Sequence, residues 1–599
     1  MAGMTRRHFL RTTAALSAGL GLSYHAIGSA LAAPLVPAKA APSTLLQTVR
    51  QRTVGNLQYR TLVAAPGEPY VARLDLLGKQ PSGNRAKTRR SLVYLGHLSD
   101  IHIMDAQSPA RVEPLLAMSA STWSGSARPQ DTLTVHVLSA MVTAVNALQF
   151  SPVTGAPVTA VVNTGDMADM FSTLELRWYI DLLDGKSVTP NSGAPKVYEG
   201  MQAWLDTQMI YHPEDPGGDA YGEYGFPRIP GLLNTAVGQN VSSQGLAAPW
   251  YAVYGNHDTL YYGFFPVDSA MRSLALGTKK PYQWEALGLN YLAGWARQQN
   301  PLARFAQMVT TDFGMKSGFK SVTADSGRQL IDQRSFMAAH LDSPAFPGPV
   351  GHGFTQNNLD TGQTYWAADV GSRLRVLGLD TCNAVVGADG AVPQDQFDWL
   401  KTELAAAAKA NKLAIVISHH NSLTLENTAV FAVGPAQPLI HADEFIAMLH
   451  TYPNMVAWLN GHTHNNTIFA HRNPNGTGGF WEITAASCID FPQQQQMVEI
   501  VDNRDGTLSL FTTAVDHAST AEWTEADFSQ VGLASLSRQL ASNDFTENPL
   551  MRRGAAVDRN TELLVPAPFD LSGITDAELE AVHAEGKARI ARRMAKGQS

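Results

Sequence analysis

Five short apolar runs along the 599-residue chain each end in residues of the kinds that bind metal ions. The run that starts at Trp250 ends in Gly255-Asn256-His257-Asp258, which places an amide, an imidazole and a carboxylate side by side. The other four runs end in the same kinds of residue: Asp100 and His102, Asp166 and Asp169, His419 and His420, His462 and His464. Oxygen and imidazole ligands without a thiolate suit manganese, iron or zinc.

The apolar runs themselves have the properties of buried strands, because each is short, β-branched or aromatic, and bounded by glycine or polar residues. Besides the run at Trp250, they occupy residues 91–98, 156–164, 412–418 and 455–460. Amphipathic segments between them predict helices at 136–150, 395–412 and 442–453. Strands that alternate with helices imply βα units and a largely buried sheet, in which ligands bind beyond the carboxyl ends of the strands.

All five polar clusters follow the carboxyl ends of predicted strands, so we expect them to converge on one site. The candidate ligands are Asp100, His102, Asp166, Asn256, His419, His462 and His464. Seven ligands are too many for one tetrahedral ion and suit two metals that share a carboxylate. A single histidine after a strand is usually structural, so the prediction depends on the whole ordered set.

The ordered motifs DIH, GDMAD, GNHD, SHH and GHTH resemble those of the calcineurin-like metallophosphoesterase superfamily. The segments LRVLGLDT and QFDWLKTEL, which precede the SHH strand, are also typical of it. The resemblance extends from about Ser91 to His517. It implies an α/β fold (α+β, four-layer) in which a central β-sandwich of two mixed sheets is flanked by helices.

The resemblance also implies a role for each candidate ligand, with two divalent or mixed-valence ions of Mn, Fe or Zn as cofactors. One ion would be held by Asp100, His102 and His464, the other by Asn256, His419 and His462, and Asp166 would bridge them. His420 is the alternative to His419, which directly follows its strand. Asp169 stands where purple acid phosphatases carry a tyrosinate, so a purple iron centre is not expected.

Two further residues of these motifs would act beside the metals. By the same resemblance, His257 would be the catalytic histidine near the leaving group, and Asp169 would orient it and fix its tautomer. Asp258 is expected to be structural. The implied reaction is hydrolysis of a phosphomonoester or phosphodiester by a hydroxide that bridges the metals.

A non-catalytic metal-dependent binding protein on the same fold is the alternative function. The sequence favours the enzyme, because every expected position holds a competent residue. Cleavage of a phosphoanhydride or of a phospholipid head group stays open. The chain has no Gly-x-Ser-x-Gly elbow and no lysine-containing phosphate loop.

The N-terminus predicts export. Residues 5–10 read TRRHFL, a mildly apolar stretch follows, and Ala30-Leu31-Ala32 precedes Ala33. These features are typical of a twin-arginine signal over residues 1–32, and a membrane anchor is the alternative. The signal predicts a protein that uses the twin-arginine export machinery and is periplasmic or secreted. No later stretch of about 18 apolar residues predicts a membrane span. Cleavage would remove three arginines and lower the net charge from −8 to −11, which argues against a surface that coats nucleic acid.

The proposed domain at 91–518 contains two insertions, at about 171–249 and 259–372, and extensions at 33–90 and 519–599 flank it. The insertions either roof the site or pack as decoration. The candidate substrate contacts within them are Tyr211, His212, Arg228 and His352. Residues 211–233 are rich in Gly, Pro and Tyr and predict an ordered loop.

Asn503–Gly506 predicts a hairpin turn, and residues 576–597 predict a charged terminal helix that is either solvated or docked. Cys382 and Cys488 either form one bridge or remain buried thiols.

Overall fold

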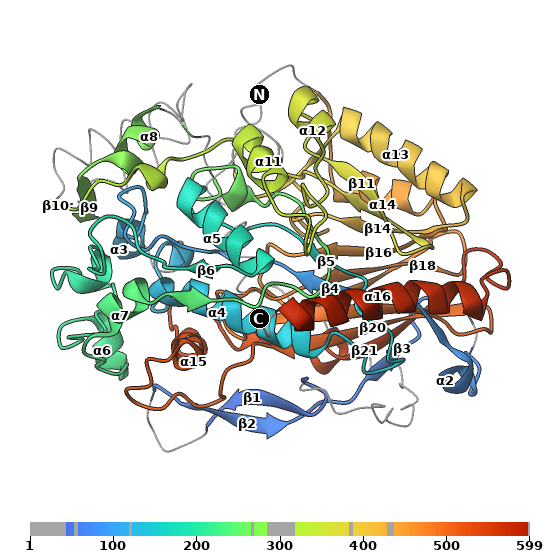
Figure 1. Cartoon of the computed structure of the whole chain (residues 1–599), viewed down its shortest axis with the longest axis horizontal. Coiled ribbons are helices and arrows are strands. Elements are labelled where there is room, and N and C mark those ends of the chain that lie inside the picture. Colours follow the sequence, from blue (N-terminus) through green and yellow to red (C-terminus); the bar gives the residue numbers. More distant parts are fainter. Residues whose placement is uncertain are drawn as a thin grey trace.

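The computed structural model describes residues 43–596 apart from 53–57, 79, 119–122, 265–266, 268, 284–317, 383–386 and 428–436. The predicted export signal lies outside the described residues, as do residues 33–42 of the predicted N-terminal extension. Figure 1 shows two large sheets with helices on their outer sides.

A seven-stranded sheet has the order β3-β21-β20-β19-β4-β5-β8, and a six-stranded sheet has the order β11-β12-β14-β16-β18-β17. The first comprises β3 (Val71–Arg73), β21 (Thr561–Pro566), β20 (Thr507–Asp516), β19 (Gln494–Asp502), β4 (Arg90–Leu98), β5 (Ala160–Asn163) and β8 (Trp250–Ala252). The second comprises β11 (Trp366–Val370), β12 (Leu374–Gly378), β14 (Leu413–Ile417), β16 (Met455–Asn460), β18 (Gly479–Thr484) and β17 (Thr467–Arg472). Both sheets contain parallel and antiparallel pairs, so the predicted fold class of two mixed sheets flanked by helices is confirmed.

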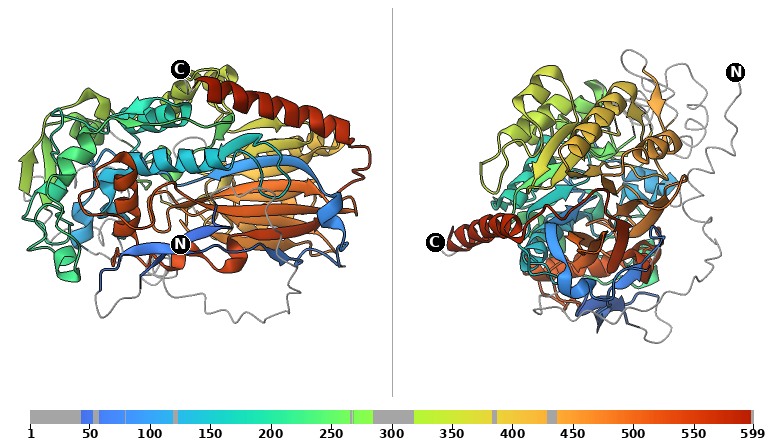
Figure 2. Two further views of the ribbon diagram at one scale, coloured as in Figure 1. Left: turned by 60° about the horizontal axis from the view of Figure 1, so that its bottom comes forward. Right: turned by 90° about the vertical axis from the view of Figure 1, so that its right-hand side faces the viewer.

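One hydrophobic core joins the two sheets. It includes Leu95 of β4 and Val161 of β5 from one sheet, and Ile415 of β14 and Leu459 of β16 from the other. Figure 2 shows the sheets stacked face to face. The five predicted strands are β4, β5, β8, β14 and β16. Within each sheet these strands run parallel to one another, so their carboxyl ends lie at one edge of that sheet.

Helices cover both outer faces. The predicted helices are α4 (Thr134–Ala147), α13 (Gln394–Lys409) and α14 (Ala442–Leu449). The last two pack on the six-stranded sheet through a separate apolar cluster that includes Phe397, Phe445 and Trp458. On the other side, α4 packs against β20 and against α15 (Gln530–Ala541).

The C-terminal helix α16 (Asp576–Lys596) is docked, which settles the alternative left open by the sequence. Leu579 and Ile590 are buried, and the Glu578 carboxylate accepts two hydrogen bonds of 2.8 Å from Arg373. Both extensions also contribute to the seven-stranded sheet, through β3 and β21. The hairpin turn predicted at 503–506 joins β19 to β20.

The insertions contain more regular structure than the sequence predicted. The expected loop at 211–233 includes α6 (Ala220–Tyr224) and the start of α7 (Leu232–Gly238), and α5 (Thr173–Asp184) precedes it. The Asp219 side chain caps α6 by accepting from the Gly222 amide, and Gly225 ends the helix, so one of the glycines that predicted a loop is a helix end. The remaining elements are α2 (Arg85–Thr88), α3 (Pro114–Met118), α8 (Ser269–Leu276), α11 (Gln333–Leu341), α12 (Gln356–Thr361), β1 (Gln47–Gln51), β2 (Leu62–Pro66), β6 (Ser187–Val188), β7 (Val241–Ser242), β9 (Lys279–Gln283), β10 (Gly318–Ser321), β13 (Val392–Pro393) and β15 (Leu439–Ile440).

Cys382 and Cys488 are both buried and free. Among the helices of the described residues, none is both long and apolar enough to span a bilayer.

Candidate metal centre

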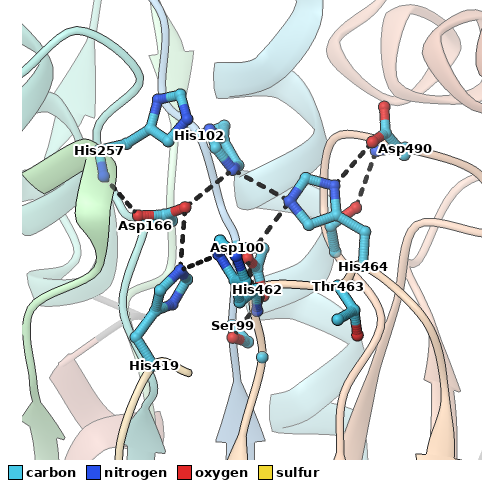
Figure 3. A network of polar contacts seen from close by, with 12 residues as sticks. Ser99, Asp100, His102, Asp166, His257, His419, His462, Thr463, His464 and Asp490 are labelled. Atoms are coloured by element: carbon cyan, nitrogen blue, oxygen red, sulfur yellow. Dashed lines mark hydrogen bonds and ion pairs between the residues drawn. The ribbon is translucent and has the colours of Figure 1, made fainter. Parts of the chain in front are cut away.

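The loops after the five strands are joined to one another by backbone hydrogen bonds. The Asp100 amide donates to the Gly165 carbonyl at 3.0 Å, and the His102 amide donates to the Asp166 carbonyl at 2.9 Å. On the other sheet, the Gly461 amide donates to the His419 carbonyl at 2.9 Å. The two sets of loops are joined by the His462 amide, which donates to Asp100 Oδ1 at 3.0 Å. Figure 3 shows predicted ligands from both sheets together at this place.

Five of the seven predicted ligands adopt the left-handed backbone conformation, with φ between 49° and 68°: Asp100, His102, Asp166, His462 and His464. Each such residue costs about 1–3 kcal/mol, and residues of this kind cluster at functional sites. Two glycines beside the predicted ligands are required because a neighbouring loop approaches each of them too closely for a side chain. A Cβ on Gly255 would lie 2.1 Å from the Asp166 amide nitrogen, and one on Gly461 would lie 1.9 Å from Ser99 Oγ.

The first group of ligands consists of Asp100, His102 and His464. His464 Nε2 lies 3.2 Å from Asp100 Oδ1 and 3.2 Å from His102 Nε2. All three side chains are buried.

The second group is formed by Asp166, Asn256, His419 and His462. His419 Nε2 lies 3.1 Å from Asp166 Oδ2 and 3.1 Å from His462 Nδ1. His462 Nδ1 in turn lies 3.1 Å from Asn256 Oδ1. Asp166 Oδ2 is also 3.6 Å from His102 Nε2, so this carboxylate lies between the two groups.

The protonation pattern of the histidines fits cations at this place. The far nitrogen of each of three rings faces an acceptor: His102 Nδ1 faces the Asp169 carboxylate at 3.2 Å, His464 Nδ1 faces the Asp490 carboxylate at 2.7 Å, and His419 Nδ1 faces the Thr164 carbonyl at 2.9 Å. In the neutral form of each ring these nitrogens carry the proton, and each Nε2 presents a lone pair. Inside the cluster, lone pairs and carboxylate oxygens then face one another at about 3 Å, which is unfavourable without a positive charge between them.

The spacing of the ligand atoms also suits metal ions. Bonds of about 2.1 Å at right angles around an ion place neighbouring ligand atoms about 3 Å apart. The distances of 3.1–3.2 Å within each group match this value. The histidine–aspartate cluster is thus compatible with a dinuclear centre whose two ions share Asp166.

The pKa values of the cluster point the same way. Burial by itself would lower the pKa of His419, but the Asp166 and Asp100 carboxylates raise it to about 9. Burial would raise the pKa of Asp166, yet the surrounding histidines hold it well below its usual range. The carboxylates thus stay ionised and attract positive charge, which a proton supplies when no metal is bound.

Two buried carboxylates anchor the ligand histidines from outside. Burial would raise the pKa of Asp490, but Arg128, Arg552 and His464 hold it well below its usual range. Arg128 Nε donates to Asp490 Oδ1 at 2.7 Å, while Asp490 Oδ2 accepts from His464. Such outer partners fix the tautomer and orientation of ligand histidines.

Asp169 is the second anchor, and it contacts two histidines. Its carboxylate faces His102 Nδ1 and accepts from Arg111 Nη1 at 2.8 Å, whereas its backbone carbonyl accepts from His257 Nδ1 at 2.7 Å. The sequence predicted that Asp169 orients His257. In the structure the Asp169 carbonyl makes that hydrogen bond, while the carboxylate faces Nδ1 of His102, a predicted metal ligand, at 3.2 Å and lies 3.9 Å from His257 Nδ1.

His257 lies beside the cluster and is partly exposed. Its ring centroid is 4.7 Å from that of His102, and its amide donates to Asp166 Oδ1 at 2.8 Å. The side chain of His257 is 16% exposed, against 2% for His102. Because Nδ1 donates to the Asp169 carbonyl, Nε2 is the ring nitrogen that can contact a ligand.

The neighbours of these motif residues have structural roles. The Asp258 carboxylate accepts from the amides of Gly255, Met167 and Ala168 and so ties the loop after β8 to the loop after β5. Burial and the nearby Asp166 raise the pKa of Asp258 to about 7. His420 is engaged through both nitrogens, with the Thr381 hydroxyl and the Ala388 carbonyl.

The four candidate substrate contacts have other partners, and this corrects the sequence-based selection. The Tyr211 hydroxyl donates to the Pro227 carbonyl, and both His212 nitrogens face backbone carbonyls, of Gln202 and Thr207. Arg228 is exposed and donates to the Glu214 carbonyl at 2.9 Å. His352 is fully buried and stacks on Trp250 with ring centroids 3.3 Å apart. Glycine, proline and aromatic content marked ordered segments in the insertions but did not mark contacts with the site.

Sequence reasoning missed Asp490, Arg111 and Arg128, which lie outside the strand-end motifs. Asp490 follows shortly after β18, and its partner His464 is 26 residues away along the chain. No local spacing marks such pairs, because the fold brings them together.

No family model matches the chain, and no curated protein matches it. Among solved structures, a dimetal phosphatase from Danio rerio is similar to this chain with 9% sequence identity and a TM-score of 0.32, and the match covers 72% of this chain and 100% of that one.

Proposed function

We propose that the protein is a two-metal phosphoesterase that hydrolyses a phosphomonoester or a phosphodiester. The observation that carries the proposal is the pair of ligand groups that share Asp166, with the accessible His257 beside them. Two ions bound there would polarise the phosphate oxygens and lower the pKa of a bound water.

The residues of the chain have distinct tasks in this proposal. Asp100, His102 and His464 hold one ion, and Asn256, His419 and His462 hold the other, with Asp166 between them. Asp490 and Asp169 keep the histidines in the tautomer that turns Nε2 toward the ions.

His257 acts as the proton donor to the departing alkoxide. The carbonyl of Asp169 accepts from Nδ1 and so leaves Nε2 for the substrate, and an imidazolium at this place transfers the Nε2 proton to the leaving oxygen. General acid catalysis of this kind contributes about 10²–10⁴-fold to the rate. The partial exposure of His257 leaves it accessible to a substrate.

The proposed place of action is outside the cytoplasm, after twin-arginine export. This part is supported by the TRRHFL head and the small-residue exit at Ala30–Ala32. Detection of the processed protein in the periplasm or medium, and its retention in the cytoplasm when Arg6 and Arg7 are replaced by Lys, would test it.

The enzymatic proposal is tested with the metal-loaded protein and two esters, p-nitrophenyl phosphate and bis(p-nitrophenyl) phosphate. We expect hydrolysis of at least one, and a 10²–10⁴-fold lower kcat in His257→Ala with unchanged metal content. His583→Ala, on α16, is the matched control and should retain activity. Protein that binds two ions per chain but cleaves neither ester would favour a non-catalytic binding protein, and full activity in His257→Ala would remove His257 from the reaction.

A further inference from the structure

A tight turn from the second insertion lies directly on the pair Asn256 and His257. The Phe264 amide donates to the Tyr261 carbonyl at 3.1 Å, and the two central residues, Tyr262 and Gly263, have φ of 52° and 64°. Two successive positive φ values identify a type I′ turn. A Cβ on Gly263 would lie 2.4 Å from Asn256 Nδ2 and from His257 Cδ2, so the turn backbone is in contact with both side chains.

Tyrosine is an unusual choice at the first central position of this turn. Glycine, asparagine or aspartate adopts a positive φ more readily, and an aromatic residue there is a conformational outlier that costs about 1–3 kcal/mol. The other residues of the described chain with this conformation include five of the predicted metal ligands. The side chain of Tyr262 is therefore a candidate for a functional contact that offsets the strain.

The Tyr262 ring stands between His257 and Trp123. Its centroid is 5.6 Å from the His257 ring, in an edge-on arrangement, and 6.3 Å from the Trp123 ring. Burial raises the pKa of its hydroxyl, which therefore stays a neutral donor. Tyr262 is half-buried, and within the part of the chain that the structure describes no residue forms a hydrogen bond with its hydroxyl, so this donor is open to a ligand.

The Tyr262 hydroxyl shares a small space with Arg128. A Cβ built on Gly125 would lie 3.4 Å from the hydroxyl and 3.4 Å from Arg128 Nη2, so the two donors flank the same point. The guanidinium is held by Asp490 through Nε and by the Gly125 carbonyl through Nη1, at 2.7 and 2.9 Å. Its Nη2 makes only a long contact of 3.4 Å, with Asp490 Oδ2. A fixed cation and a neutral donor thus converge beside the metal centre.

We propose that Tyr262 and Arg128 form a subsite for an anionic group carried by the leaving alcohol of the substrate. This inference rests on the proposed phosphoesterase function. Because His257 protonates the leaving oxygen and Tyr262 packs against His257, the part of the substrate beyond the scissile bond reaches the space at Gly125. A carboxylate or phosphate oxygen satisfies both donors, and hydrogen bonds to charged groups are the stronger ones. The preferred substrates are phosphate esters whose alcohol has its own carboxylate or phosphate.

The test compares kcat/KM for phenyl phosphate with that for 3-carboxyphenyl and 4-carboxyphenyl phosphate, and with that for phenyl phosphate bearing a second phosphate. We expect at least one anionic ester to be preferred about 10-fold or more. Tyr262→Phe should lower kcat/KM for that ester roughly 10- to 100-fold more than for phenyl phosphate, since one hydrogen bond to a charged group is lost. Gly125→Ala, whose methyl occupies the shared space, should reduce the same preference.

Tyr224→Phe is the matched control. Tyr224 belongs to the first insertion, stacks on Phe545 and has no assigned contact with the site. It should leave the preference of the wild-type protein unchanged. Equal kcat/KM for neutral and anionic esters would overturn the subsite. So would an equal loss on all esters in Tyr262→Phe, which would indicate that the ring only supports His257.

Failure of the proposed function can be separated from failure of the subsite. If the metal-loaded protein hydrolyses none of these esters, binding of phenylphosphonate and of 3- and 4-carboxyphenylphosphonate is measured by calorimetry. Tighter binding of a carboxylated ligand that is lost in Tyr262→Phe would support the subsite without the enzyme. Equal affinities for all three ligands would overturn it.

Discussion

Replacement of Asp490 by Asn should weaken metal binding although Asp490 lies outside both ligand groups. In the wild-type protein its two oxygens accept from His464 Nδ1 and Arg128 Nε, both at 2.7 Å. An asparagine of the same shape has one acceptor oxygen and one NH₂ group, so it satisfies only one of these donors and turns the NH₂ toward the other.

The expected loss follows from the position of Asp490. Removing the outer partner of a ligand histidine typically lowers metal affinity about 10- to 100-fold, which corresponds to about 1.4–2.7 kcal/mol. The Asp490 side chain is 5% exposed, so water cannot replace the lost hydrogen bond. We therefore expect the effect to lie toward the upper end of this range.

The assay is competition for metal between the protein and a chelator of known affinity at fixed pH. Glu547→Gln is the matched control, because Glu547 contacts Arg552 of the same charged network but has no contact with a ligand histidine among the described residues. Metal affinity of Asp490→Asn within threefold of wild type would refute the anchoring role. An equal loss in Glu547→Gln would attribute the effect to the charged network as a whole.

Three further predictions follow from the same geometry. Gly255→Ala should abolish metal binding at the shared carboxylate of Asp166, because the added Cβ would lie 2.1 Å from both the Asp166 amide nitrogen and Oδ1. Gly573→Ala, whose Cβ would have nothing within 4 Å, should retain the metal, and elemental analysis measures the metal content of both variants. Removal of metal by a chelator should lower the Tm of the wild-type protein, because an ion that binds only the folded state stabilises it. This stabilisation amounts to about 4 kcal/mol when the free metal concentration exceeds Kd 1,000-fold. An unchanged Tm on scanning calorimetry would contradict occupancy of the cluster. Burial raises the pKa of Glu175 from 4.5 to about 8. Between these pH values the native state binds more protons than the unfolded state, so the contribution of Glu175 to the free energy of unfolding should fall by on the order of a few kcal/mol as pH rises from about 5 to 8. Glu175→Gln cannot ionise, so its deficit in free energy of unfolding relative to wild type should shrink over the same pH range in urea denaturation, and a constant deficit would contradict the raised pKa.

The strand ends and the grouping of the candidate ligands were predictable because they are local in the sequence. Each apolar run carries its polar residues immediately after it, and parallel strands place such residues at one edge of a sheet. The glycines of the motifs, such as Gly255 and Gly461, mark the same positions, since a side chain there would collide with a neighbouring loop. These features require no knowledge of long-range contacts.

The contacts around the ligands were not predictable in this way. Arg128 meets Asp490 across 362 residues, and Arg111 meets Asp169 across 58. Tyr262 stands next to the DIH, GDMAD and GNHD loops only because a type I′ turn reverses the chain four residues after Asp258. Composition predicted that residues 211–233 are ordered, but the partners of Tyr211 and His352 depend on packing that the sequence does not display.

The most direct test of the central claim is a crystal structure of the metal-loaded protein with anomalous scattering measured at the absorption edge of the bound element. The account predicts two anomalous peaks about 3.5–4 Å apart, both within bonding distance of the Asp166 carboxylate, with Asp100, His102 and His464 on one side and Asn256, His419 and His462 on the other. A single peak, or two peaks that do not share Asp166, would contradict it.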